Sequence, residues 1–244
     1  MKIVGLIPAR QGSKRIPNKN VKEFFGHPLM AYTIQVAKDA GVFDELYVST
    51  DSYAYGNIAR EYGVPAVIRD RGEGDTSMDI DWIKNLLSKV KHDDWDAIAI
   101  LRPTNPFRSI KMLKDAKILF EGMGCDSLRA MQLCKEHPCK AWRTYDDDGF
   151  IFVRPQSLFD PDNLMHEKQY QSLPETYTQN GSLELVKLKT LKVFNNLTGV
   201  KVAPLVTKNY EGFDINTPED WMLAEALVNK GWVKLREVKR EKGI

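Results

Sequence analysis

Apolar segments of two kinds alternate along the first half of the chain. Strands are predicted at residues 2–9, 45–50, 65–68 and 96–101, and the first of them is a continuous apolar run, typical of strands covered on both faces. Between them, helical spacing of apolar residues covers 27–40, 52–62, 78–91 and 109–121. This alternation predicts an α/β fold with a doubly wound, mostly parallel sheet and crossover helices.

The pattern changes after residue 124. Extended segments are predicted at 127–133 and 141–153, followed by a polar stretch rich in Pro and Gln at 154–174. We interpret 1–244 as a single domain from which about 138–180 makes an excursion, either a lid, an oligomer contact or a plain hairpin insertion. Regular structure is predicted to resume at 182–188, 201–206 and in a helix over 217–230, before a charged tail at 234–242 that we expect to fray.

The loop after the first strand carries Arg10, Lys14, Arg15 and Lys19 around Gly12. Ligands of open α/β sheets collect at the loops that follow the carboxyl ends of strands. A glycine permits close approach of backbone amides to an anion, and the cations add charge. The pattern predicts a polyphosphate site, with a solvated basic turn as the alternative.

Two more polar loops follow predicted strands. The first, 69–77, holds charged residues and Ser77 that could bind a base or ribose, although a solvated charged loop explains it equally well. The second, 101–108, is stiffened by two prolines, so Arg102 and Arg108 would lose little freedom on binding an anion. Alternatively, the prolines end the strand and Arg108 starts the next helix, where a cation is electrostatically unfavourable.

The segment 214–220 combines a helix start with an unexplained carboxylate. Thr217 as N-cap, Pro218 at the first helical position and Asp220 at the third account for the capping of the next helix. Asp214, just ahead of them, has no capping role. A carboxylate at a strand end is a hard oxygen ligand suited to Mg²⁺.

Composition limits the function classes. The formal net charge is +2, from 35 Lys+Arg and 33 Asp+Glu, so no global basic field points to nucleic acid. The three cysteines have no paired spacing, which favours neither disulfides nor a zinc site. No run of about 18 apolar residues and no leader pattern occurs, so we expect a cytoplasmic protein without membrane contact.

Four motifs together resemble the acylneuraminate cytidylyltransferases, the CMP-sialic acid synthetases. They are Ile7-Pro8-Ala9-Arg10-x-Gly12-Ser13-Lys14-x-Ile16-x-x-Lys19-Asn20, the segment 101–108, Gln171-x-Leu173-Pro174-x-x-Tyr177-x-x-Asn180-Gly181, and Asp214-Ile215-x-Thr217-Pro218-Glu219-Asp220. The resemblance implies a Rossmann-like nucleotidyltransferase fold and transfer of CMP from CTP to the anomeric hydroxyl of an acidic sugar, with release of pyrophosphate. It also implies Mg²⁺ and a homodimer whose dimerisation arm lies around 154–171.

Matching positions in this chain give the expected site. We expect catalytic roles for Arg10, Lys19 and Asp214; nucleotide binding by Arg10, Gly12, Ser13, Lys19, Asn20, Arg69 and Ser77; substrate binding by Arg102, Arg108, Gln171 and Tyr177; and Mg²⁺ binding by Asp214 and Asn216. These roles suit the chemistry, because Mg²⁺ and cations neutralise the triphosphate and the departing pyrophosphate.

The chain departs from the family pattern on the acceptor side. Arg102 replaces a neutral Gln, no arginine precedes Gln171, and Glu184 stands where the family has Tyr. Asn216 replaces the second metal aspartate. We expect an altered anionic acceptor with the activation chemistry retained; alternatives are transfer to a sugar phosphate and a catalytically silent nucleotide-binding protein. The absence of G-x-G-x-x-G after the first strand and of G-x-x-x-x-G-K-[ST] disfavours a Rossmann oxidoreductase and a P-loop enzyme.

Overall fold

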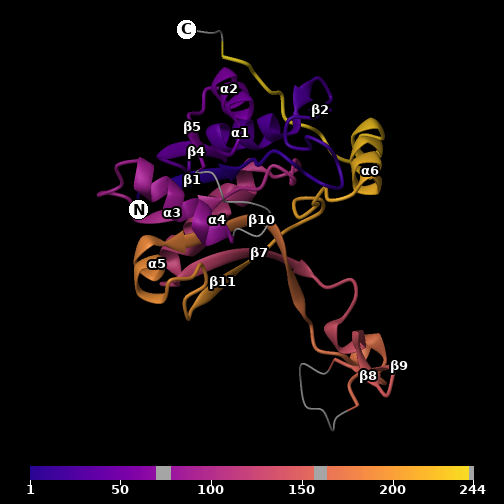
Figure 1. Cartoon of the computed structure of the whole chain (residues 1–244). Coiled ribbons are helices and arrows are strands. Elements are labelled where there is room, and N and C mark those ends of the chain that lie inside the picture. The colour runs from indigo at the N-terminus through magenta and orange to yellow at the C-terminus, as the bar shows by residue number, and fades with distance from the viewer. Residues whose placement is uncertain (70–77, 157–163, 242–244) are drawn as a thin grey trace. The chain divides into compact units, whose positions relative to one another are not determined.

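The computed structural model describes residues 1–69, 78–156 and 164–241 (Figure 1). The chain forms two compact units, and each is described separately. The first contains Met1–Ala130 and Asn180–Ile244, and the second contains Met131–Gln179.

The first unit is built on a seven-stranded sheet with the strand order β11-β7-β10-β6-β1-β4-β5. The strands are β1 (Ile3–Pro8), β4 (Glu45–Thr50), β5 (Ala66–Ile68), β6 (Ala97–Ile100), β7 (Ser127–Leu133), β10 (Tyr177–Lys187) and β11 (Val202–Val206). β1 pairs in parallel with β4 and β6, β4 pairs in parallel with β5, and β10 is antiparallel to β6. The predicted α/β, mostly parallel fold is confirmed.

Helices cover both faces of this sheet because successive strand residues point to opposite sides. In β1, Ile3 and Ile7 face one core and Val4 and Leu6 face the other. The first core includes residues of α1 (Leu29–Ala40), α2 (Tyr53–Glu61), α4 (Ile110–Gly122) and α6 (Pro218–Asn229). The second includes residues of α3 (Asp79–Lys89) and α5 (Leu188–Phe194).

Local sequence signals set the helix ends. Gly41 ends α1 in the left-handed conformation at φ 61°. The Ser109 hydroxyl accepts a hydrogen bond from the Met112 amide, 3.0 Å away, and caps α4. Thr217 and Asp220 form the expected capping box of α6. These caps fix where the loops that carry the candidate site residues begin and end.

The register brings three site-bearing loops to one edge of the sheet. Pro8 at the end of β1 lies opposite Ser49 of β4, and Leu6 lies opposite Ile100 of β6. Thr50 at the end of β4 in turn lies opposite Ile68 at the end of β5. The parallel strands β1, β5 and β6 therefore deliver the loops that follow them to the same side of the sheet, as expected for ligand sites of open α/β sheets.

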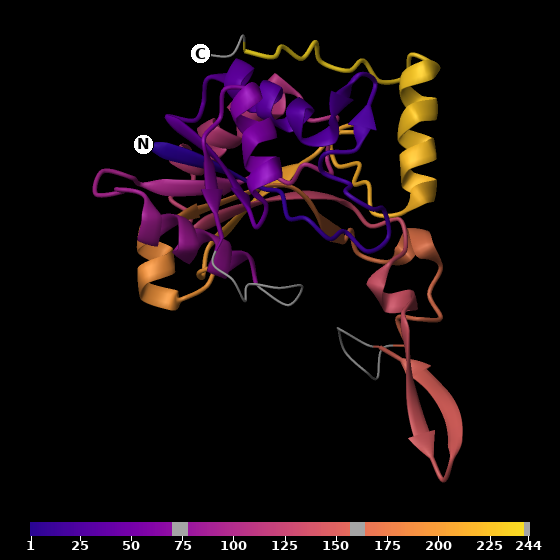
Figure 2. The ribbon, with the colours of Figure 1, turned by 45° about the horizontal axis from the view of Figure 1, so that its top comes forward.

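The second unit contains an antiparallel hairpin of β8 (Trp142–Asp147) and β9 (Phe150–Pro155), seen clearly in Figure 2. Its turn places Asp148 and Gly149 at φ 51° and 81°, the left-handed values that Asp and Gly tolerate in tight hairpins. The extended segments and turn predicted around 146–149 are confirmed. Two short 3₁₀ helices, η1 (Pro138–Lys140) and η3 (Tyr170–Ser172), also belong to this unit.

Three local features differ from the sequence-based expectation. Two-residue strands β2 (Glu23–Phe24) and β3 (His27–Pro28) precede α1, whose start is therefore later than predicted. α5 follows β10 without a loop and was not predicted.

The predicted fraying of the C-terminal tail is wrong over its described part. Arg240 Nε donates to the Tyr62 hydroxyl at 3.1 Å, and the Glu241 amide donates to the Glu61 carbonyl at 2.8 Å. Val238 is buried. Glu241 and Arg236 also pair with Lys38 and Asp39 of α1. The charged side chains of this tail therefore have specific partners, which a count of charges does not reveal.

Candidate nucleotide site

A pocket of about 570 Å³ lies in the first unit. Its described lining residues are Pro8, Arg10, Ser13, Lys14, Arg15, Ile16, Lys19, Asn20, Arg69, Trp82, Arg102, Pro103, Thr104, Asp214 and Asn216. The pocket thus joins the basic loop, the ends of β5 and β6, and the segment before α6. Cations outnumber the single carboxylate in this lining, so the pocket suits a polyanionic ligand.

The basic loop is held in place by backbone contacts. The Ala9 amide donates to the Ser49 carbonyl at 2.8 Å, and the side-chain amide of buried Asn20 donates to the Arg10 carbonyl at 2.9 Å. Gly12 lies at φ +78° with no atom within 4 Å of where a Cβ would be. It allows the turn, and it is not among the described pocket-lining residues.

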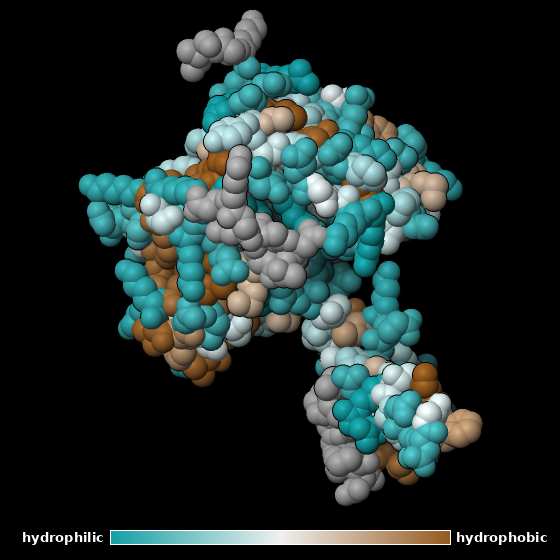
Figure 3. All heavy atoms as spheres, viewed as in Figure 1, coloured by the Kyte–Doolittle hydropathy of each residue, from teal (hydrophilic) through white to brown (hydrophobic). Residues whose placement is uncertain are grey.

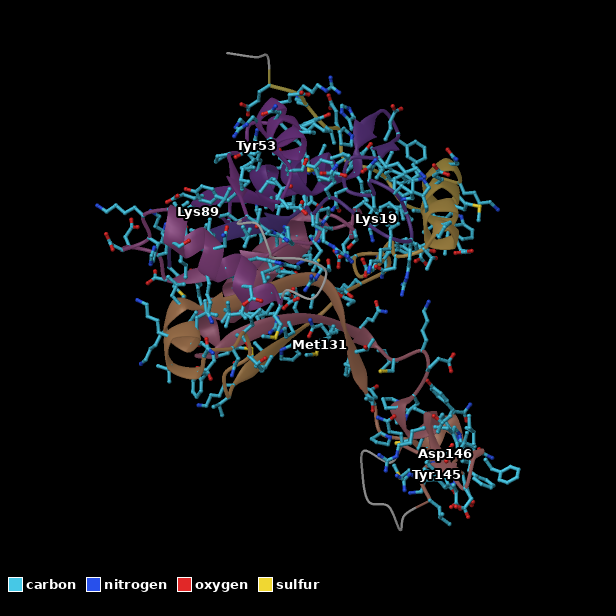
Figure 4. The ribbon with its side chains drawn as sticks, in the orientation of Figure 1. Lys19, Tyr53, Lys89, Met131, Tyr145 and Asp146 are labelled. Atoms are coloured by element: carbon cyan, nitrogen blue, oxygen red, sulfur yellow. The ribbon has the colours of Figure 1, made fainter. Side chains whose placement is uncertain are left out.

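Lys19 connects this loop to the segment before α6 (Figure 4). Its Nζ donates to the Ile215 carbonyl at 2.6 Å. Burial lowers the pKa of Lys19; the charge of Asp214 opposes this shift, and the charge of Arg10 adds to it. Lys19 therefore places a partly desolvated ammonium beside Asp214.

Asp214 carries an unsatisfied buried oxygen. Its Oδ2 accepts a hydrogen bond from Asn216 Nδ2 at 2.6 Å, whereas its Oδ1 is buried and has no hydrogen-bond partner among the described residues. A buried carboxylate oxygen without a donor is costly unless a cation or other ligand completes it. This oxygen and the nearby Asn216 amide fit Mg²⁺, which binds through one or two protein ligands together with substrate phosphates and water.

Few acidic side chains surround this position. No group of three or more His, Cys, Asp or Glu with metal-site geometry occurs in the described parts of the chain. For Asn216 to coordinate, its carbonyl oxygen has to replace the Nδ2 that now faces Asp214, a rotation of the terminal amide.

Arg69 is fixed at the end of β5. Its Nε donates to the Ser49 hydroxyl at 2.8 Å and one terminal nitrogen donates to the Ser49 carbonyl at 3.1 Å. The guanidinium also lies 4.5 Å from the Trp82 ring centroid, a cation–π contact. Trp82 was not predicted, because an aromatic residue on an amphipathic helix is indistinguishable from a core residue in the sequence. Ser77 lies outside the described residues.

Arg102 and Arg108 have different environments although one loop carries both. Arg102 lines the pocket and pairs with Asp79 and Glu184. Arg108 is 5% exposed and donates to the Ser182 carbonyl, the Thr33 hydroxyl and the Arg102 carbonyl. Burial lowers the pKa of Arg108 to about 9. The structure thus differs from the expectation that Arg108 is presented to an anion, because its donors are engaged inside the fold.

Gln171 and Tyr177 belong to the second unit. Both are exposed there, and the Tyr177 hydroxyl donates to Glu175 Oε2 at 3.2 Å. Their contact with substrate stays a prediction.

The family model described as Cytidylyltransferase matches residues 4–119. Over 234 residues the chain is 31% identical to the CMP-N,N'-diacetyllegionaminic acid synthase of Legionella pneumophila, covering 93% of this chain and 97% of that protein. It is 29% identical to the N-acylneuraminate cytidylyltransferase of Escherichia coli, covering 94% of this chain and 52% of that protein. The chain therefore spans about half the length of that relative.

Solved structures support the same fold. A CMP:2-keto-3-deoxy-manno-octonic acid synthetase complexed with CTP matches with a TM-score of 0.66 and 17% identity, covering 95% of this chain and all of that one. The 4-diphosphocytidyl-2C-methyl-D-erythritol synthase of Anaerococcus prevotii matches with a TM-score of 0.61 and 15% identity, covering 93% and 98%. Given the full-length match to the Legionella protein, the chain belongs to the cytidylyltransferase family that includes CMP-legionaminic acid synthases and N-acylneuraminate cytidylyltransferases.

Proposed function

We propose that this chain transfers CMP from CTP to a hydroxyl of an acidic sugar of the sialic acid class. The acceptor oxygen forms a bond to the α-phosphorus, and the bond from that phosphorus to the bridging oxygen breaks. Pyrophosphate leaves with the electron pair, and the hydroxyl proton passes to water. The observation that carries this proposal is the convergence of the basic loop, Lys19 and Asp214 on one pocket in a cytidylyltransferase family member.

The phosphate side of the reaction belongs to residues 10–20. Arg10, Ser13 and Lys19 bind the phosphates, and Asn20 keeps the loop in the required shape through its bond to the Arg10 carbonyl. Their charges oppose the negative charge that develops on the leaving pyrophosphate. Arg69, held by Ser49, binds the nucleotide from another side of the pocket.

Asp214 and Asn216 would hold Mg²⁺. When bound there, the ion neutralises phosphate charge and aligns the leaving group. The unsatisfied Asp214 Oδ1 supports this assignment. Asn216 supplies a neutral ligand in place of a carboxylate, so this pair brings one negative charge to the metal.

The reaction is tested with purified protein, CTP, MgCl₂ and either N,N'-diacetyllegionaminic acid or N-acetylneuraminic acid. We expect pyrophosphate and the CMP-sugar, measured by a coupled assay and by mass spectrometry, and a loss of both in Asp214→Ala. CTP-dependent thermal stabilisation without turnover on either acceptor, or on sugar phosphates, would instead favour a nucleotide-binding protein. No thermal shift with CTP would refute the nucleotide site.

We also propose that the chain acts as a homodimer through the second unit. The hairpin of β8 and β9 is drawn in Figures 3 and 4. Its exposed large apolar side chains are those of Trp142, Tyr145, Phe150, Ile151, Phe152 and Val153. An apolar surface of this kind favours association. Sedimentation analysis of Ile151→Asp against Asp146→Asn, a polar change in the same hairpin, should give a monomer only for the first; a monomeric wild type refutes the dimer.

Across the described ranges, no helix has both the length and the apolar character needed to cross a bilayer. Cytoplasmic location stays a prediction.

A further inference from the structure

A network of four charged side chains adjoins the pocket beside Arg102. Arg102 follows β6 and pairs with Asp79, the first residue of α3, and with Glu184 of β10 at 2.8 Å. Glu184 also pairs with Arg129 of β7. Two guanidinium and two carboxylate groups give the network no net charge.

Burial divides this network into an inner and an outer half. The side chains of Glu184 and Arg129 are 4% and 9% exposed, whereas those of Asp79 and Arg102 are 23% and 26% exposed. Arg129 further donates to the Leu197 carbonyl at 2.8 Å. The inner pair is therefore a fixed anchor, since removal of one member of a buried ion pair is strongly unfavourable.

The path of Arg102 into the pocket is fixed by its surroundings. A Cβ on Gly181 would lie 3.2 Å from both Cδ and Nε of Arg102, so glycine leaves room for the side chain to pass. The guanidinium lies 5.8 Å from the Trp82 ring centroid. Both terminal nitrogens of Arg102 face carboxylates, so its charge is compensated inside the protein.

We propose that Asp79 and Glu184 are positioning residues that hold Arg102 at the pocket and balance its charge. The part of the pocket wall formed by Arg102 then selects acceptors that present an uncharged polar group to it. A hydroxyl or acylamino carbonyl accepts a hydrogen bond from a guanidinium edge without needing net charge. A carboxylate or phosphate placed there is disfavoured, because the carboxylates of the network cancel the guanidinium charges and leave no net attraction to offset the desolvation of the anion. This inference rests on the proposed cytidylyltransferase function and disfavours a sugar phosphate acceptor at this wall.

Glu184→Gln tests the proposal because it preserves shape and removes one negative charge. We expect the KM for N,N'-diacetyllegionaminic acid to rise about tenfold, with the KM for CTP and the CTP-dependent thermal shift unchanged. Inorganic phosphate, tested at saturating CTP, should inhibit competitively with the acceptor more strongly than in the wild type. Adding Arg102→Gln restores a neutral network and should return phosphate inhibition toward the wild-type value.

Glu45→Gln is the matched control. It also removes a carboxylate that has several partners, Lys2, Tyr47 and Trp95, but it lies at the start of β4, away from the strand ends that form the pocket. It should lower stability without changing acceptor KM or phosphate inhibition. If Glu184→Gln unfolds, Asp79→Asn tests the more exposed half of the network with the same readouts.

The outcomes separate this inference from the proposed function. An unchanged acceptor KM and unchanged phosphate inhibition in a folded Glu184→Gln protein would overturn the inference and leave the network purely structural. If the wild type binds CTP but turns over neither sugar acid, the proposed function fails. The wall is then tested by phosphate-induced thermal shift at saturating CTP, which must be larger in Glu184→Gln than in the wild type; equal shifts overturn it.

Discussion

Replacing Arg108 by Met should destabilise the fold while leaving the nucleotide site intact. The guanidinium donates to the carbonyls of Ser182 and Arg102 and to the Thr33 hydroxyl, and it ties β10 and α1 to the loop after β6. Methionine fills similar space but donates no hydrogen bond. The substitution therefore leaves three buried or partly buried acceptors without this donor.

The magnitude follows from those acceptors. Each unsatisfied buried acceptor costs about 1–3 kcal/mol, and relief of the desolvation of one buried charge offsets part of the sum. A net loss of about 3 kcal/mol in the free energy of unfolding results. For a chain of this size, that loss corresponds to a fall in Tm of about 6–12 °C.

Urea and thermal denaturation with and without CTP measure this effect. Lys111→Met is the control, because Lys111 is an exposed cation at the start of α4 whose partner is Asp115, one turn away. It should change stability by less than about 0.5 kcal/mol. If Arg108→Met unfolds like the wild type but raises the acceptor KM, the buried guanidinium contacts substrate and the reasoning is refuted.

Two further predictions concern the pocket, and a third concerns the cap of α6. Burial lowers the pKa of Lys19 below its ordinary 10.5. Because the unfolded lysine keeps its proton to higher pH, this group adds to the free energy of unfolding as pH rises from its folded pKa toward 10.5. Over the same pH range, loss of the proton in the folded protein removes a cation from the phosphate-binding side of the pocket. CTP-dependent thermal shifts should thus fall with pH in that window and be flat in Lys19→Met; equal pH dependence in both proteins excludes Lys19 as the source. Asp214→Ala should abolish the part of CTP stabilisation that EDTA removes from the wild type, and an unchanged EDTA effect contradicts the metal role. Thr217→Ala should cost about 1 kcal/mol of unfolding free energy through loss of the α6 cap, and an unchanged urea midpoint would show that the cap contributes nothing.

The parallel part of the sheet was predictable because apolar strand segments alternate with helical segments there, and because some helices end at recognisable signals. β4 has the predicted bounds, and Gly41 ends α1 as expected. α5 was not predictable in the same way: it follows β10 directly, with no turn residue between them, and its seven residues carry too little periodicity to separate a helix from a strand. Element boundaries that depend on tertiary packing cannot be predicted from the local sequence.

Most of the predicted nucleotide and metal residues line one pocket because strand order and register bring their loops together: Arg10, Ser13, Lys19, Asn20, Arg69, Asp214 and Asn216. Gly12 is not in the described lining, and Ser77 lies outside the described residues. The partners of buried charges were not predictable. Glu184 attracted notice only as a departure from the family motif, and nothing in the sequence places Asp79 beside Arg102. Such pairs join residues 23 and 82 positions apart, and only the fold determines them.

Arg102 and Arg108 illustrate why a cation in a loop is insufficient to identify an anion site. Arg108 is buried and bound by neutral acceptors, and Arg102 is balanced by carboxylates. Most of the cations in the pocket lining, Arg10, Lys14, Arg15 and Lys19, belong to the basic loop at residues 10–19. A triphosphate gains most by lying along that loop. The acceptor sugar then binds at the charge-neutral network around Arg102. The uneven distribution of charge in the pocket thus orients both substrates, with the α-phosphorus between them.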